Sequence, residues 1–168
     1  VAYNDQTLIL YNLSSSNVVT KKFDRIYDAE FLTDDTLAML VKKEHTLEYL
    51  RILPTGGTES HPFEGQLSQK NSRGKLVDIS ANGDLVYLNS QLEMIYWNHS
   101  RPSEHILTGF YSSRPSSIYL YPDQVAAVAD IDRGIHLYDM RRNMLLGRLH
   151  LPVASPQFVS GFEDYLFA

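Results

Sequence analysis

The feature that most limits the fold of this 168-residue chain is an internal repeat. Four segments each read as an apolar run, a short polar turn with an acidic residue, and a second apolar run. The first apolar residues after the turns, spaced 48, 40 and 40 residues apart, are Leu37, Leu85, Val125 and Tyr165. Residues that end four aliphatic runs, spaced 41, 45 and 41 apart, are Tyr11, Ile52, Trp97 and Tyr138. Two series that agree on a period of about 40 to 45 residues predict a stack of similar structural units.

The apolar runs have the length and surroundings of β-strands. Runs such as 37–41, 85–88 and 125–129 are short and are bounded by residues that favour turns. Asp, Asn and Gly close such turns through their side chains or tolerate positive φ. The turn residues also interrupt any apolar stripe before it reaches the roughly 11 residues that a helix needs. The sequence therefore predicts an all-β chain of short strands joined by hairpins.

The composition fits a soluble globular protein, with 43% hydrophobic and 21% charged residues. The net charge of −5 offers no overall positive field for a phosphate backbone or an anionic lipid surface. The chain has no cysteine, which excludes disulfides, thiolate metal sites and a cysteine nucleophile. No apolar run approaches the roughly 20 residues of a membrane helix. We therefore do not expect the chain to bind a membrane, and nucleic acid is disfavoured as a partner.

Two segments carry a resemblance to a known family. Ile135–Asp139 and Met94–Asn98 resemble the aliphatic strand ending in Trp-Asp of the WD-repeat family, and Ile9–Asn12 does so less closely. The resemblance implies a β-propeller of four-stranded antiparallel blades, incomplete in this chain. We expect one partial propeller of about four blades. Residues 1–27 would end one blade, 28–74, 75–115 and 116–155 would be successive repeats, and 156–168 would begin the next.

An open arc of blades has a physical consequence. Its two end faces would be apolar and uncovered, so the isolated chain is expected to associate or to be partly molten. We therefore expect the missing blades to come from the parent chain or from a partner.

The residues that often carry chemistry fall in places with a structural explanation. The acidic pairs Asp34-Asp35, Asp130 with Asp132, and Glu163-Asp164 lie in expected hairpin turns, where Asp is favoured for backbone reasons. The six histidines never take metal-ligand spacing, and no Gly-x-Ser-x-Gly elbow or phosphate loop is present. We predict no catalytic residues, no metal site and no cofactor.

Three arginines suggest a binding surface. Each stands six residues before an apolar residue of an expected innermost strand: Arg25 before Phe31, Arg73 before Ile79, and Arg114 before Leu120. In the family that the chain resembles, the loops entering these strands surround one mouth of the central channel. Three guanidiniums on one rim, with Tyr111 nearby, would suit an acidic or phosphorylated peptide. The alternative is three solvated arginines paired with neighbours such as Asp24 or Asp28.

The expected function is therefore non-enzymatic. The resemblance implies an interaction scaffold or substrate-recognition propeller in an intracellular multiprotein complex of the cytoplasm or nucleus. One alternative is a propeller-fold hydrolase with acids at the channel, for which only Asp28 and Asp78 stand at the starts of inner strands. Another is an RNA- or chromatin-associated propeller, which the acidic balance opposes.

Overall fold

The computed structural model describes most of the chain. The described residues are 2–3, 6–11, 16, 18–68, 75–101, 105–111, 114–121, 123–131, 134–150, 160–162 and 165–167. For residues 2–3, 105–111, 160–162 and 165–167 this covers the backbone alone. The chain divides into two compact units, Val1–Glu64 and Gly65–Ala168.

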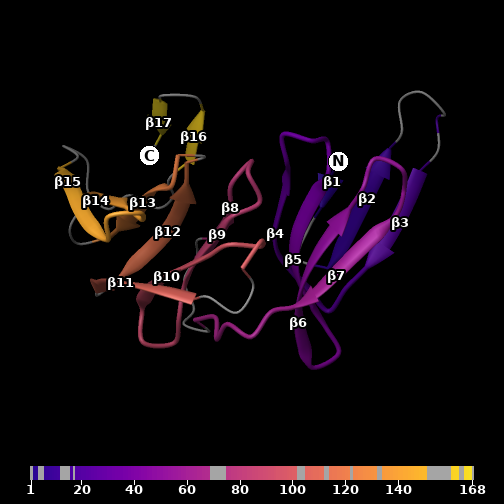
Figure 1. The fold of residues 1–168 in the computed structure, drawn as a ribbon, viewed down its shortest axis with the longest axis horizontal. Helices are drawn as coiled ribbons and strands as arrows, with labels where there is room; N and C mark the ends of the chain where they lie inside the picture. Colours follow the sequence, from indigo (N-terminus) through magenta and orange to yellow (C-terminus); the bar gives the residue numbers. More distant parts are fainter. Residues whose placement is uncertain are drawn as a thin grey trace. The chain divides into compact units, whose positions relative to one another are not determined.

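The first unit holds two antiparallel sheets (Figure 1). The three-stranded sheet consists of β1 (Ala2–Tyr3), β2 (Thr7–Tyr11) and β3 (Val18–Lys22). The four-stranded sheet consists of β4 (Arg25–Phe31), β5 (Leu37–Lys43), β6 (Thr46–Ile52) and β7 (Thr58–Pro62). In both sheets neighbours in sequence are neighbours in space, as expected for strands joined by hairpins.

The second unit holds two four-stranded antiparallel sheets and a hairpin. The first sheet consists of β8 (Val77–Ile79), β9 (Leu85–Leu88), β10 (Glu93–Trp97) and β11 (His105–Tyr111). The second consists of β12 (Pro115–Leu120), β13 (Val125–Asp130), β14 (Gly134–Asp139) and β15 (Met144–Leu149). The hairpin pairs β16 (Ser160–Phe162) with β17 (Tyr165–Phe167).

These sheets confirm the predicted all-β architecture of four-stranded antiparallel units. Every element among the described residues is a strand. In that part of the chain, a search for helices long and apolar enough to cross a membrane found none.

The same type of turn joins the first two strands of each four-stranded sheet. In the first, the N–H of Leu32 donates to the carbonyl of Thr36 at 2.8 Å, and the N–H of Asp35 donates to the carbonyl of Leu32 at 3.1 Å. Ser80 to Asp84 and Tyr121 to Val125 repeat both bonds. The fourth residue of the turn has positive φ in each case, and these residues are Asp35 at 60°, Gly83 at 83° and Gln124 at 68°. This backbone is a turn followed by a left-handed residue, a standard hairpin loop.

The shared turn makes the three sheets superposable in register. Directly after it, the paired residues are Phe31 with Leu37, Ile79 with Leu85, and Leu120 with Ala126. The counterpart of Leu37 and Leu85 is therefore Ala126, and the sequence-based choice of Val125 was wrong by one residue. Val125 is instead the last residue of the turn, because its carbonyl accepts the closing hydrogen bond from Tyr121.

The third strands follow the same register. Leu37 pairs with Ile52, Leu85 with Trp97, and Ala126 with Tyr138. This confirms the predicted equivalence of Ile52, Trp97 and Tyr138 on β6, β10 and β14. Tyr11 ends β2, as Ile52 and Trp97 end their strands.

A polar contact ties each turn to the end of its third strand. Arg51 on β6 forms an ion pair with Asp34 at 3.2 Å. The hydroxyl of Tyr96 on β10 donates to Asp84 at 2.7 Å. The guanidinium of Arg141, which follows β14, donates to Gln124 at 3.1 Å. These contacts brace the turn that sets the register.

Two of these contacts change the pKa values of their side chains. The Thr36 hydroxyl and backbone N–H beside Asp34 hold the pKa of that carboxyl below its ordinary value, with Arg51 adding a smaller effect. Burial raises the pKa of Tyr96, and its hydrogen bond to Asp84 raises it further. The Tyr96 hydroxyl therefore stays a donor throughout the neutral range.

In the first unit, side chains of β2 pack on the four-stranded sheet. The buried members of this cluster are Leu8, Ile26, Leu37, Met39, Val41, Leu50 and Ile52. Leu8 and Leu10 alternate with Ile9 and Tyr11 along β2, and only the first pair joins the cluster. The strand thus turns one apolar face inward and leaves the other exposed.

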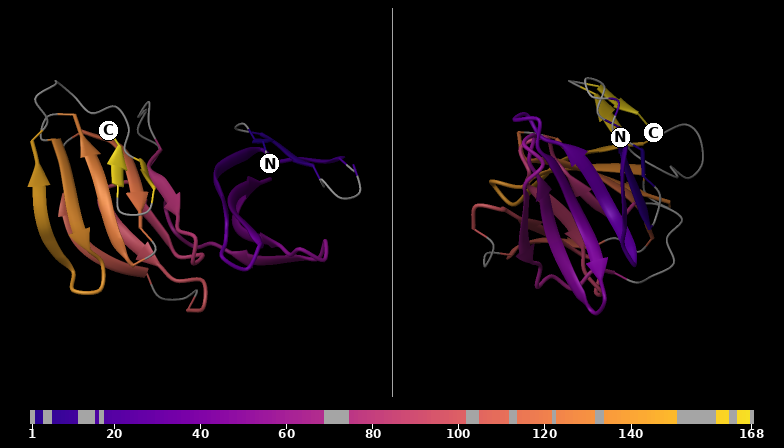
Figure 2. Two further views of the ribbon diagram at one scale, coloured as in Figure 1. Left: turned by 90° about the horizontal axis from the view of Figure 1, so that it is seen from above. Right: turned by 90° about the vertical axis from the view of Figure 1, so that its right-hand side faces the viewer.

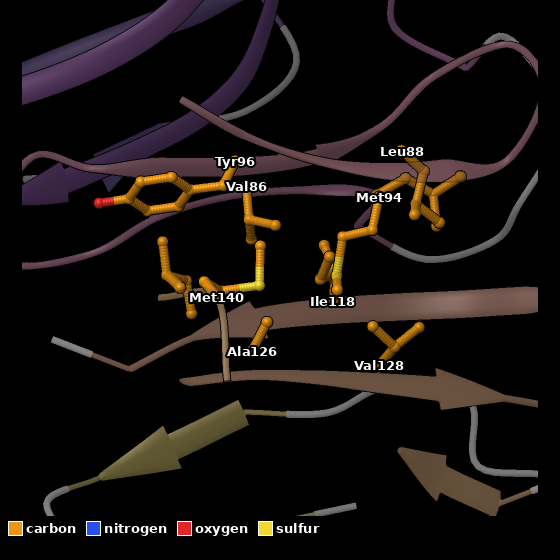
Figure 3. Packing of buried hydrophobic residues seen from close by; sticks show 10 residues of the cluster. Val86, Leu88, Met94, Tyr96, Ile118, Ala126, Val128 and Met140 are labelled. Atoms are coloured by element: carbon orange, nitrogen blue, oxygen red, sulfur yellow. The ribbon is translucent and has the colours of Figure 1, made fainter. Parts of the chain in front are cut away.

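In the second unit, the two four-stranded sheets pack face to face (Figures 2 and 3). Val86, Leu88, Met94 and Tyr96 from one sheet meet Ile118, Leu120, Ala126 and Val128 from the other. Leu76, just before β8, and Met140, just after β14, complete this set. We call this set the central cluster. The opposite face of the β12–β15 sheet carries a second cluster, which we call the outer-face cluster, of Ala127, Ala129 and Ile135 with the partly buried Tyr119, Tyr121 and Leu137. Both faces of this sheet are therefore apolar.

Hydrogen bonds also join these two sheets through their first strands. The Asp78 carboxylate on β8 accepts the backbone N–H of Leu120 on β12 at 2.6 Å and pairs with Lys75. The Lys75 carbonyl accepts the N–H of Ile118 at 2.8 Å. Asp78 is 3% exposed, so its charge is held in a largely dry place by these donors.

We expect replacement of Trp97 to be costly. Its side chain is 1% exposed and is the largest of the fully buried side chains in the described residues. Trp97→Ala should lower the free energy of unfolding by about 3–5 kcal/mol, because it leaves a cavity as well as losing buried apolar area. Urea unfolding followed by far-ultraviolet circular dichroism measures the loss. Trp97→Phe is the control and should lose much less, and an equal loss in both variants would contradict this packing role.

Removal of the Asp78 carboxylate should loosen the contact between β8 and β12. Asp78→Ala leaves the N–H of Leu120 without its acceptor, which should cost about 1–3 kcal/mol of unfolding free energy. Glu64→Ala, at an exposed carboxylate, removes the same charge and should change the urea midpoint little. Equal midpoints for the two variants would show that the carboxylate does not hold the sheets together.

Tyr87 gives a pH dependence of stability. Its side chain on β9 is 3% exposed, and burial raises its pKa to about 12 from 10.0. The neutral hydroxyl is thus favoured in the folded state, so this contribution is complete below pH 10 and is lost as the pH rises toward 12. By pH 11 the loss should be about 1 kcal/mol. Urea titrations at pH 9 and pH 11 should show a smaller pH effect in Tyr87→Phe, and an unchanged effect would refute the assignment.

Candidate interaction site

Arg25 occupies the entrance to the innermost strand of the first unit. It is the first residue of β4, and its guanidinium lies 4.9 Å from the centre of the Tyr27 ring. Directly across the ladder from Arg25 is Lys42 on β5. Like charges placed opposite each other in a sheet repel, so two adjacent cations weaken the fold locally. The same pair would favour an anion bound beside it.

Arg114 occupies the corresponding place in the second unit. It is exposed and stands immediately before β12, where its carbonyl accepts the N–H of Ile131 at 3.1 Å. Arg114 thus has the apolar Ile131 in the place where Arg25 has Lys42.

A shared irregularity supports the equivalence of the two arginines. The register of β4 with β5 shifts between Ile26 and Asp28, and that of β12 with β13 shifts between Pro115 and Ser117. Each shift lies the same number of residues before the turn that joins the first two strands of its sheet. Such bulges redirect side chains at strand ends. Arg25 and Arg114 each precede the shifted segment by one residue.

The other two predicted residues cannot be placed in this way. Arg73 lies outside the described residues. Tyr111 ends β11, but its side chain also lies outside them. The grouping of the three arginines with Tyr111 stays a prediction.

The carboxylates considered for a hydrolase have other surroundings. Asp28 on β4 is fully buried and Asp78 on β8 nearly so. Asp78 is occupied by Lys75 and by the N–H of Leu120. Asp34 accepts the N–H of Thr36 at 3.1 Å, which is the backbone role expected for Asp in a turn. Within the described part of the chain, no group of three or more His, Asp or Glu residues could hold a metal ion.

The sequence-based interpretation missed what surrounds Arg25. A signal was available, because residues two apart on a strand share a face, and Tyr27 follows Arg25 by two. Lys42 could not have been found this way. Its position opposite Arg25 depends on the register that the turn at residues 32–36 imposes.

Comparison with known proteins supports the fold. No protein-family model matches the chain, and no curated protein matches it. Solved structures do match. One is a structure of U3-55K, with a TM-score of 0.55, 14% sequence identity, and coverage of 92% of this chain and 45% of that one. Another is the crystal structure of RRP9 WD40 repeats, with a TM-score of 0.56, 13% identity, and coverage of 92% and 44%.

These matches agree with the repeat, the four-stranded antiparallel sheets and the shared register. The chain spans less than half the length of each of these two structures. At such low identity the likeness concerns the fold alone. The chain therefore has the WD40-repeat β-propeller fold.

Proposed function

We propose that the protein is a non-enzymatic interaction module of an intracellular multiprotein complex. In this proposal the entrances to the innermost strands bind an acidic or phosphorylated segment of a partner protein. WD40-repeat domains generally serve as interaction scaffolds, and the fold of this chain supports that general role.

The observation that carries the proposal is the repeated arginine at one structural position. Arg25 and Arg114 are both exposed, and both stand one residue before an equivalent register shift. Recurrence of an exposed arginine at equivalent positions of two repeats is the pattern expected for a shared binding role. By repeat spacing, Arg73 belongs to the same series.

The surroundings of Arg25 indicate the chemistry of the partner. Stacking on Tyr27 favours a fixed plane for the guanidinium, and a planar fork binds carboxylate or phosphate through two hydrogen bonds. Lys42 adds a second positive charge directly across the ladder. An anionic group placed there would relieve the repulsion between the two cations. Phosphate suits this place better than a single carboxylate because it carries more charge and more acceptor oxygens.

Charge reversal at the arginines tests the proposal. Arg25→Glu combined with Arg114→Glu should reduce retention of a degenerate phosphoserine peptide library with Glu-rich flanks. The loss should be about 1.5–3 kcal/mol for each guanidinium that contacts the peptide, and larger at low salt. Isothermal titration with the best-retained peptides measures the affinity.

The control is Arg101→Glu, which makes the same charge change at an exposed residue of the turn that follows β10. It should leave retention close to that of the unaltered protein. Equal retention of phosphorylated and dephosphorylated libraries by the unaltered protein would refute the preference for phosphate. Unchanged retention by the double variant would overturn the proposal. So would an effect of Arg101→Glu as large as that of the double variant.

A further inference from the structure

The outermost strand of the last four-stranded sheet has an unusual composition for an edge. β15 pairs with β14 and lies at the end of the strand order β12–β13–β14–β15 (Figures 1 and 2). Four of its six residues are large, apolar and exposed, namely Met144 at 48%, Leu145 at 37%, Leu146 at 49% and Leu149 at 43%. Edge strands with such side chains readily pair with another strand.

The equivalent strand of the first unit shows how this fold can protect an edge. β7 also lies at the outer end of a four-stranded sheet. Its residues are Thr58, Glu59, Ser60, His61 and Pro62, all exposed and none large and aliphatic. A charge and a proline are standard means of preventing strand addition. β15 has neither of these on its aliphatic stretch from Met144 to Gly147.

Another sheet stacked on one face would not explain the exposed side chains of β15. Leu149 pairs with Ile135, which belongs to the outer-face cluster. Leu145 pairs with Tyr138, which packs on the central cluster. Since paired residues share a face, Leu149 and Leu145 lie on opposite faces. A strand added at the edge places its own side chains on both faces and would cover both leucines.

The backbone of β15 has one edge open to pairing. Within the described residues β15 pairs with β14 alone and ends the strand order of its sheet. A strand added at this edge would lie about 4.8 Å from β15 in the hydrogen-bonding direction.

The charges around β15 indicate the occupant. Arg141 and Arg142 precede the strand, and Arg148 lies within it; all three are exposed. Asp139, the nearby acid, has a side chain only 17% exposed and lies 3.7 Å from Arg142. A second copy of this chain would bring an equally basic edge and would be repelled. An extended segment rich in Asp or Glu would be attracted.

We propose that β15 is a second docking surface, which binds an extended partner segment as a fifth strand. The segment has apolar residues on both faces of the added strand and carries Asp or Glu toward its ends. Its backbone hydrogen-bonds to β15, its apolar side chains cover the exposed leucines, and its acids meet Arg142 and Arg148. This surface is separate from the arginine positions at Arg25 and Arg114, so either proposal can fail without the other.

The test uses an eight-residue probe with blocked ends, in which four central Val residues are flanked by two Glu residues on each side. Backbone amides of every second residue point to the same edge of a strand, and those of one edge are N-methylated in the probe. The methylated edge cannot pair, so probe molecules cannot build a sheet, while the other edge stays free to pair with β15. A twin methylated on every amide has no free edge. The first probe should bind the full chain, and the twin should not. Equal binding of the two would overturn the proposal, because attraction by charge alone does not need amide donors.

Hydrogen exchange locates the bound probe. Its binding should slow exchange at amides of residues 144–149 and leave residues 58–62 on β7 unchanged. Protection confined to other strands would overturn the proposal. Concentration-dependent dimerisation with protection of residues 144–149 in the absence of probe would assign the edge to a second copy, and this would also overturn it.

Two variants test the side chains. Arg142→Glu combined with Arg148→Glu should weaken probe binding at least about tenfold at low salt. Leu146→Lys places a charge on the edge and should weaken binding similarly. Lys22→Glu, on the outer strand β3, is the matched control for charge and should leave binding unchanged. Unaltered binding in both test variants would exclude β15 as the site.

Discussion

The register of the first hairpin in each sheet is the constraint on which the remaining structure depends. Three turns of different sequence, at residues 32–36, 80–84 and 121–125, form the same pair of backbone hydrogen bonds. Each needs a left-handed residue in fourth place, and only one of the three uses glycine. Asp35 and Gln124 adopt this conformation at some cost in backbone energy. The recurrence of that cost indicates that the register is worth more than the strain.

Once the register is set, alternation assigns every strand residue to a face. In the β12–β15 sheet both faces are apolar, as the central and outer-face clusters show. Such a sheet is stable only between neighbours, which is the condition of a stacked repeat. The buried carboxylate of Asp78 fixes the relative position of the two stacked sheets of the second unit. It accepts one particular N–H, that of Leu120, and so fixes how far β12 slides along β8.

The two proposed surfaces use positive charge in different ways on a chain with a net charge of −5. At Arg25 the positive charge is concentrated, because the guanidinium lies over the Tyr27 ring and Lys42 stands across the ladder. Such an arrangement suits a compact, highly charged group. At β15 the arginines flank an exposed aliphatic strand, so charge and apolar area are spread along an edge. That arrangement suits an extended segment, and the two surfaces would thus select different parts of a partner.

The sequence by itself determined the period, the all-β class and the positions of most strands and turns. These depend on local chemistry, because turn-forming residues recur at fixed spacing and the runs between them are too short for helices. It also pointed to the repeated arginines, since position within a repeat can be counted. Only the tertiary structure decided what depends on pairing between distant strands. It moved the repeat marker from Val125 to Ala126, placed Lys42 opposite Arg25, buried Asp28 and Asp78, and left β15 exposed. Hydrogen bonds across a ladder join residues far apart in the chain, so a shift of one residue changes the face of each side chain while the composition stays the same.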